Sequence, residues 1–223
     1  MINNNELKNE STLKLERLNK QAMEFSQKKI EILKNITKEH LNMEFSEDEL
    51  QEIYIRMEND FDNIKNNILV TFNNLFENII DKQRNGTKKP IEKIYMSFLR
   101  TRLLEGRGMF LIEAFDENIF LDDVETNILL DFDFVYESHF NKAKELMELK
   151  EKYREYIREE DITMILLESS VKYFIFIADI MVQFINRDIT KLQSFKDLNK
   201  GKKIEFNIGF YRASAYKICE YEI

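Results

Sequence analysis

The chain has few of the residues that interrupt helices. Its 223 residues include five glycines and a single proline: Gly86, Pro90, Gly106, Gly108, Gly201 and Gly209. Neither residue type occurs in 1–85 or in 109–200. Glycine permits positive φ angles and proline removes a backbone donor, so both tend to mark turns. The two tracts without them predict long helices, joined by short elements at 86–108 and 201–209.

Cysteine is nearly absent as well. Cys219 is the only one, which excludes an internal disulfide framework and fits a reducing cytoplasm. Its neighbours are Glu220 and apolar residues, which would not lower the pKa of the thiol. We therefore expect a buried structural cysteine rather than a nucleophile.

The motifs that carry phosphate, metal or redox chemistry are missing from the sequence. It contains no P-loop, no GxGxxG, no HExxH and no CxxC, and Gly106 with Gly108 makes only a GxG. Phosphate cradles need glycine-rich backbone, and this chain has little of it. We expect a non-enzymatic protein without a cofactor.

The chain also lacks targeting and membrane signals. The first ten residues, MINNNELKNE, have neither the basic nor the apolar region of a signal peptide. The most apolar stretch, 164–185, is interrupted by Glu168, Lys172 and Asp179, so its charge-free runs fall short of the roughly 18–20 residues that cross a bilayer. This stretch predicts a buried helix, and the sequence predicts a cytoplasmic protein without a membrane partner.

Charge and composition limit the partners further. The hydrophobic fraction of 43% is typical of a globular protein, and the net charge of −8 opposes nonspecific binding to nucleic acid or anionic lipid. The abundance of Asn, Lys and Ile is typical of an AT-rich genome, such as that of a low-GC bacterium or its phage.

A narrow apolar seam marks the first helix, which follows a frayed terminus over 1–12. Apolar residues recur at a spacing of three and four, with Lys29 interrupting them: Leu15, Leu18, Ala22, Phe25, Ile32 and Ile36. About two positions in seven is the pattern of a coiled-coil seam rather than of a globular core face. We expect the seam to be covered either by the C-terminal part of the chain or by a second copy.

The second helix begins at a capping box. Ser46 can accept from the backbone of Glu49 while the Glu49 carboxylate returns to Ser46, and Phe45 with Leu50 forms a hydrophobic staple. The apolar pattern continues to about residue 82. Because the link over 42–46 is short, we expect an antiparallel helical hairpin over 13–82.

The rest of the chain predicts a compact α+β part over 90–223. Two apolar runs around the glycines predict a β-hairpin with strands near 93–104 and 109–121, with a short helix after Pro90 as the alternative. Helices are expected over 138–157 and 162–193, and alternating residues predict C-terminal strands over 203–222 that join the hairpin in one small antiparallel sheet. The segment 123–137 fits either a strand or a helix. The fold class is therefore mainly α with a minor antiparallel β element, α+β overall.

Charge is segregated around the expected hairpin. Residues 82–107 carry eight bases and two acids, and residues 109–141 carry nine acids and no base. Opposite charges on paired strands can neutralise each other, which makes the pattern internal complementarity. The alternative is a surface for a partner, and five bases would then contact phosphate: Lys88, Lys89, Lys93, Arg100 and Arg102.

Carboxylates suggest one metal hypothesis. Asp133 and Glu137 are spaced i, i+4, and Asp131 adds a third oxygen ligand for a hard divalent ion. This requires 123–137 to be helical, and His139 would then point away from the carboxylate face.

We therefore expect a helical protein–protein interaction module that self-associates through its N-terminal helices. The residues expected to carry the interaction are Phe61, Ile64, Ile68 and Phe72. The alternative function is a nucleic-acid-contacting accessory protein of a phage or bacterial defence system that uses the five bases above. The third is a metal-dependent hydrolase that uses Asp131, Asp133 and Glu137.

Overall fold

The computed structural model describes residues 4–40, 44–118 and 124–222, with the side chains of the first range described from residue 16 onward. The chain is 62% helical and 20% strand, which confirms a mainly helical α+β fold. It divides into two compact units. The helical unit comprises Met1–Asn42 and Asn141–Ser169, and the sheet unit comprises Met43–Phe140 and Ser170–Ile223. Each unit is described by itself.

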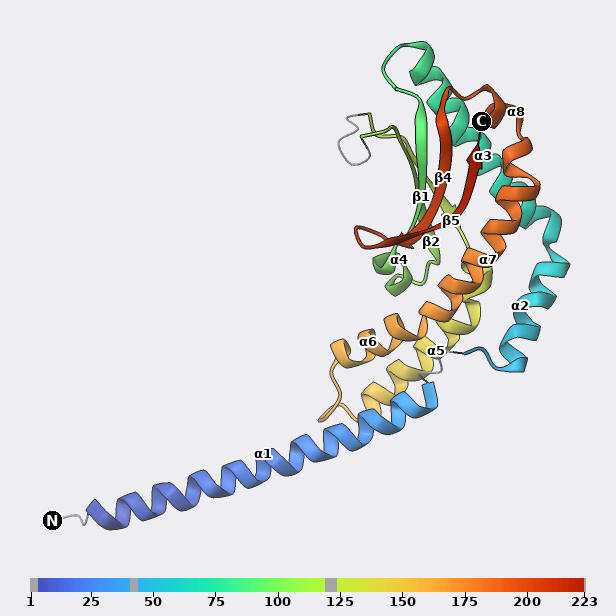
Figure 1. The fold of residues 1–223 in the computed structure, drawn as a ribbon. Coiled ribbons are helices and arrows are strands. Elements are labelled where there is room, and N and C mark those ends of the chain that lie inside the picture. Colours follow the sequence, from blue (N-terminus) through green and yellow to red (C-terminus); the bar gives the residue numbers. More distant parts are fainter. Residues whose placement is uncertain (1–3, 41–43, 119–123, 223) are drawn as a thin grey trace. The chain divides into compact units, whose positions relative to one another are not determined.

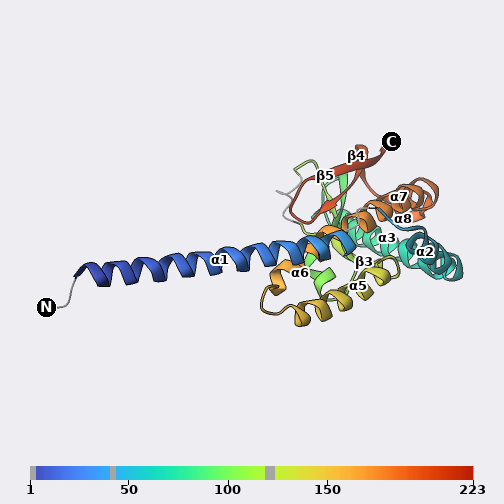
Figure 2. The ribbon, with the colours of Figure 1, turned by 90° about the horizontal axis from the view of Figure 1, so that it is seen from below.

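The helical unit packs α1 (Asn4–His40) against the end of α5 (Asp133–Lys152) and against α6 (Glu159–Ser169). Figures 1 and 2 both show α1 alongside these two helices. Its core is formed by isoleucines and leucines: Ile32, Ile36, Leu146, Ile157, Ile162, Ile165 and Leu166. The expected hairpin over 13–82 is therefore not the unit of packing, because α1 shares its core with 141–169 whereas residues 47–82 belong to the sheet unit.

The sheet unit contains a five-stranded sheet in the order β3-β2-β1-β4-β5. The strands are β1 (Ile91–Phe98), β2 (Met109–Phe115), β3 (Asn127–Asp131), β4 (Lys200–Phe210) and β5 (Ala215–Glu222). The predicted joining of the C-terminal strands to the hairpin is confirmed. The sheet is mixed rather than antiparallel, because β4 pairs parallel with β1 after a long helical connection, which parallel pairing requires.

The hairpin prediction is confirmed in its pairing but not in its turn. β1 and β2 are antiparallel, with Tyr95 opposite Glu113. Their connection contains the short helix α4 (Arg100–Leu104), which buries Leu103 and ends before Gly106 at a φ of 77°. Gly108 follows where a Cβ would lie 2.3 Å from the ring of Tyr136, so a side chain cannot fit there.

Two expected helices are interrupted at polar residues. The helix over 47–82 is split into α2 (Glu47–Asn59) and α3 (Phe61–Arg84) at Asp60. The helix over 162–193 is split into α6, α7 (Val171–Arg187), a 3₁₀ turn (Ile189–Lys191) and α8 (Gln193–Asp197). Asp and Ser side chains compete for backbone hydrogen bonds, and the Ser169 hydroxyl donates to the Leu166 carbonyl at 3.1 Å beside the break between α6 and α7.

The ambiguous segment 123–137 contains both structures. Residues 127–131 form β3, and α5 begins at Asp133. Each of the two competing patterns therefore describes one half of the segment.

Helices α3 and α7 lie on the same side of the sheet (Figure 1). Between them and the strands is an aromatic core in which Phe98 packs on Phe110 at 5.2 Å and on Tyr136 at 5.4 Å between ring centroids. Phe174 of α7 stacks on Phe210 of β4 at 4.8 Å. These contacts join the sheet to the start of α5 through Tyr136 and to α7 through Phe174.

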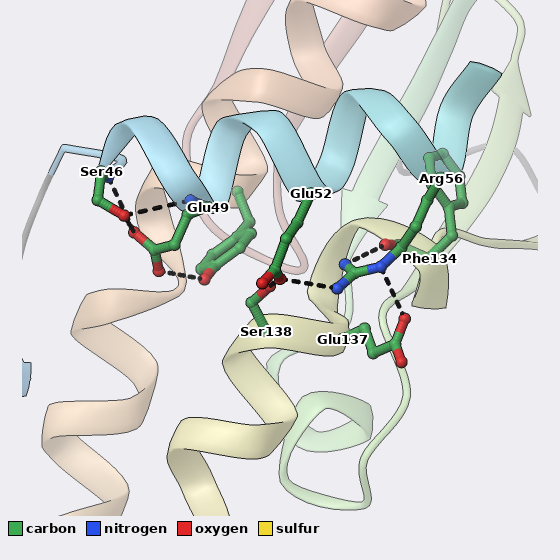
Figure 3. A network of polar contacts seen from close by, with 8 residues as sticks. Ser46, Glu49, Glu52, Arg56, Phe134, Glu137 and Ser138 are labelled. Atoms are coloured by element: carbon green, nitrogen blue, oxygen red, sulfur yellow. Dashed lines mark hydrogen bonds and ion pairs between the residues drawn. The ribbon is translucent and has the colours of Figure 1, made fainter. Parts of the chain in front are cut away.

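The predicted capping box is present at the start of α2 (Figure 3). The backbone of Glu49 donates to Ser46 Oγ at 3.2 Å, and Ser46 N donates to Glu49 Oε2 at 3.0 Å. Farther along α2, Arg56 Nε pairs with the Glu137 carboxylate at 2.9 Å and the Ser138 hydroxyl donates to Glu52 at 3.1 Å. These contacts fasten α2 to the first turns of α5.

Candidate interaction surface

The C-terminal half of the α1 seam lies in the core of the helical unit. Ile32 and Ile36 are 6% and 3% exposed against α5 and α6. Two turns before Ile32 on the seam, the ring of Phe25 stacks on Tyr156 with centroids 5.0 Å apart. The C-terminal part of the chain therefore covers this half of the seam, which is one of the two coverings expected from the sequence.

Lys29, which interrupts the seam, has a partner in the same unit. Its Nζ lies 2.7 Å from Oδ2 of Asp161 at the start of α6. Burial opposes ionisation of Asp161, but the hydrogen bonds from Lys29 and from the backbone of Arg158 outweigh it and hold the pKa of that carboxyl below its ordinary value. The interruption is thus a specific ion pair that fixes α1 against α6.

The described seam residues before Phe25, Leu18 and Ala22, are exposed. Every residue from 16 to 28 is exposed, including Leu18 at 53% and Phe25 at 48%. A helix gains most of its stability by burying an apolar face, and an isolated helical stretch of this length is marginal in water. Leu18 and Ala22 therefore form an apolar stripe, here called the free seam, that would gain stability from a partner.

The free seam has the spacing of a two-stranded coiled coil. The seam residues fall at alternate steps of three and four, which are the a and d positions of a heptad. The e and g positions between Leu18 and Ala22 are the uncharged Asn19 and Gln21, and the next pair is Ser26 and the charged Lys28. Charges at e and g positions select unlike partners and separate like ones, so Asn19 and Gln21 place no like charges beside the free seam when the helix pairs with its own copy.

The four residues expected to carry the interaction on α3 have different environments. Ile64, Ile68 and Phe72 are buried in the core of the sheet unit, whereas Phe61 is 46% exposed. Phe61 borders a groove of about 610 Å³ between α2, α3 and α7, where its ring stacks on Phe184 at 6.5 Å. Of the four, only Phe61 is available to a partner.

The five bases expected to contact phosphate are engaged within the chain. The buried Lys88 donates to the Val124 carbonyl at 2.7 Å. The contacts of the others are Lys89 with Glu117 at 3.7 Å, Lys93 with Glu205 at 3.7 Å, Arg102 with Glu105 at 2.7 Å, and Arg100 over the Phe210 ring at 5.4 Å. Of these contacts, only that of Lys89 with Glu117 pairs a base of 82–107 with an acid of 109–141.

The three carboxylates of the metal hypothesis are bound by arginines. Arg107 contacts Asp131 at 2.5 Å and Asp133 at 2.7 Å, whereas Glu137 pairs with Arg56. Over the described ranges, no group of three or more His, Cys, Asp or Glu side chains is arranged to hold a metal ion.

Cys219 is half-buried on β5. Its thiol donates to the side-chain oxygen of Asn186 at 3.2 Å, and burial raises the pKa of the thiol above its ordinary value. Both effects favour the unreactive thiol, in keeping with a structural role.

Comparison with protein-family models, with curated proteins and with solved structures found no match for this chain. In the part of the chain that the structure describes, no helix combines the length and the apolar character that a bilayer crossing requires.

The spacing of apolar residues predicted the seam of α1, but it did not predict which half would be covered and which would be free. Covering depends on residues 141–169, more than a hundred positions away, and on a lysine that looks like a break in the pattern. The available signal for the covered half was Lys29 on the seam together with Asp161 at the start of a distant helix, because opposite charges can pair.

Proposed function

We propose that this protein is a non-enzymatic interaction module that pairs with a second copy of itself through the free seam of α1. The observation that carries the proposal is the exposure of residues 16–28 on a helix whose seam continues, in register, from buried positions. In a parallel or antiparallel pair, Leu18 would bury its side chain against the partner helix, which stabilises a dimer by roughly 1.5–3 kcal/mol for each such leucine.

The test is the mass of the intact chain in solution, measured by size-exclusion chromatography with light scattering. We expect a species of twice the 26.9 kDa of one chain. Leu18→Asp should return the mass to that of a monomer, because a charge at a seam position cannot be buried without a partner. The helical unit should remain folded, since Leu18 lies outside its core.

Gln27→Asp is the matched control, because it adds the same charge to the exposed helix at a position outside the seam. A wild-type monomer over the micromolar range would refute self-pairing. A dimer that Leu18→Asp leaves intact would refute the free seam as its interface.

Phe61→Asp separates this interface from the groove on the sheet unit. Phe61 is exposed, so the substitution should leave the fold intact. If the variant remains a dimer, the groove takes no part in self-pairing. By contrast, aspartate at the buried Ile64 would test only whether the unit folds.

A further inference from the structure

A cavity of about 500 Å³ opens on the face of the sheet opposite to that of the core side chains. Side chains alternate across a strand, so Ile94, Met96 and Phe98 of β1 face the helices and the intervening Tyr95 and Ser97 face the cavity. This volume is within the roughly 300–1,000 Å³ of small-molecule sites.

The hollow results from small residues in one cross-strand row. Ser97 of β1 pairs with Gly209 of β4, and Gly209 pairs with Ala215 of β5. A Cβ at Gly209 would meet the backbone of Ser214 and Ala215, so the chain after β4 covers this position, and the short side chains that line the cavity are those of Ser97 and Ala215.

Aromatic side chains also line the cavity. Tyr95 and Phe115 lie on β1 and β2 with ring centroids 5.6 Å apart in a T-shaped arrangement. Tyr211, in the turn after β4, borders the cavity from the other side. Aromatic faces carry negative charge density and attract cations.

The charged groups that line the cavity are mainly acidic. Glu113 is directly opposite Tyr95 in the strand register and is half-buried, and Glu125 lies beside it. Burial raises the pKa of Glu113, and the charge of Glu125 raises it further, whereas Arg212 lowers it. The net rise means that Arg212 does not fully compensate the buried carboxylate.

Arg212 also lines the cavity. It has a φ of 58°, in the left-handed region that non-glycine residues rarely adopt, and its guanidinium lies over the neighbouring Tyr211 ring at 5.2 Å. The side chain is exposed and stacks on Tyr211.

We propose that this cavity binds a small organic cation, with its ammonium group against Glu113 and its apolar or aromatic body against the rings of Tyr95 and Phe115. A carboxylate supplies the opposite charge and the rings supply cation–π attraction, which together distinguish an amine from a neutral molecule of equal size. Glu125 adds attraction at the entrance. The proposal concerns the sheet unit alone and does not depend on pairing through α1.

The experiment is isothermal titration calorimetry of the full chain with three matched probes. Tyramine carries an ammonium group, tyrosol has a neutral hydroxyl in its place, and 4-hydroxyphenylacetate has a carboxylate. We expect tyramine to bind at low-millimolar concentration or better, with tyrosol weaker by roughly tenfold, which corresponds to one ion-pair contact. The anion should not bind.

Variants assign the binding to this cavity. Glu113→Gln keeps the shape of the side chain and should weaken tyramine by roughly tenfold, whereas Glu222→Gln, a control at the exposed end of β5, should leave its affinity unchanged. Ala215→Leu fills the floor without changing charge and should abolish binding, which provides a second test if Glu113→Gln fails to fold.

Three results would overturn the proposal. The first is tighter binding of the anion than of the amine. The second is an affinity for tyramine that neither Glu113→Gln nor Ala215→Leu changes. The third is no binding of tyramine at low-millimolar concentration.

Discussion

A buried ion pair at the start of α2 provides the sharpest test of the packing of the sheet unit. Lys172 Nζ of α7 lies 2.8 Å from Glu49 Oε2, with the two side chains 3% and 12% exposed. The ammonium also donates to the Glu44 carbonyl at 3.2 Å and lies over the Phe45 ring at 4.9 Å. Glu49 in turn accepts from the Tyr173 hydroxyl at 3.2 Å.

The size of the effect follows from what each deletion leaves behind. At an effective dielectric constant of about 20, charges roughly 3 Å apart attract by about 6 kcal/mol, and burying the two ions costs several kcal/mol each. The intact pair is therefore close to balanced. Glu49→Ala would leave the ammonium of Lys172 buried without its counter-charge, so we expect a loss of about 3–5 kcal/mol in the free energy of unfolding.

Lys172→Met should cost less than Glu49→Ala, because methionine fills the same space and the Glu49 carboxylate left behind keeps its hydrogen bonds from Ser46 and Tyr173. Glu47→Ala is the matched control, since it removes an exposed carboxylate from the same helix end and forfeits only about 0.3–1 kcal/mol of helix-dipole stabilisation.

The assay is urea unfolding followed by far-ultraviolet circular dichroism and by tyrosine fluorescence, since the chain has no tryptophan. A Glu49→Ala variant within about 1 kcal/mol of the wild type would refute the reasoning. An equal loss for Glu47→Ala would show that the helix end, and not the ion pair, carries the effect.

Three further predictions concern single contacts. Ile36→Ala should lower the stability of the helical unit by about 2–4 kcal/mol in the same urea assay, because it empties part of a closed core. Gly108→Ala should lower the melting temperature, since the added Cβ would meet the ring of Tyr136 at 2.3 Å. The lowered pKa of Asp161 means that its ion pair with Lys29 stabilises the fold above the unfolded pKa of about 4 and stops doing so as the pH falls through the folded value. Thermal melts should therefore lose stability below about pH 4, and less so in Lys29→Met.

Local signals in the sequence were sufficient for the parts of the fold that local contacts determine. The capping box at Ser46 depends on four consecutive residues, and the structure contains it. The alternation over 204–210 predicted β4, whose inward residues Ile204, Phe206 and Ile208 are buried. The class of fold was predictable for the same reason.

Pairings between segments far apart in the sequence could not be predicted from local patterns. The parallel pairing of β1 with β4 depends on the path of the intervening helices over the sheet. The sequence showed an acid-rich stretch after a base-rich one, but it could not show that Arg107 would bind Asp131 and Asp133 together. For the candidate site, the spacing of the seam was predictable, whereas the half that remains exposed was not.

The helical unit is assembled from two stretches that a ribosome makes far apart in time. The residues of α1 emerge before their core partners over 141–169, which follow only after the whole of 43–140 has been made. Through that interval Ile32 and Ile36 have none of the contacts that bury them in the finished unit. During synthesis the whole apolar seam of α1 is therefore exposed, and its exposed part is longer on the growing chain than on the folded protein.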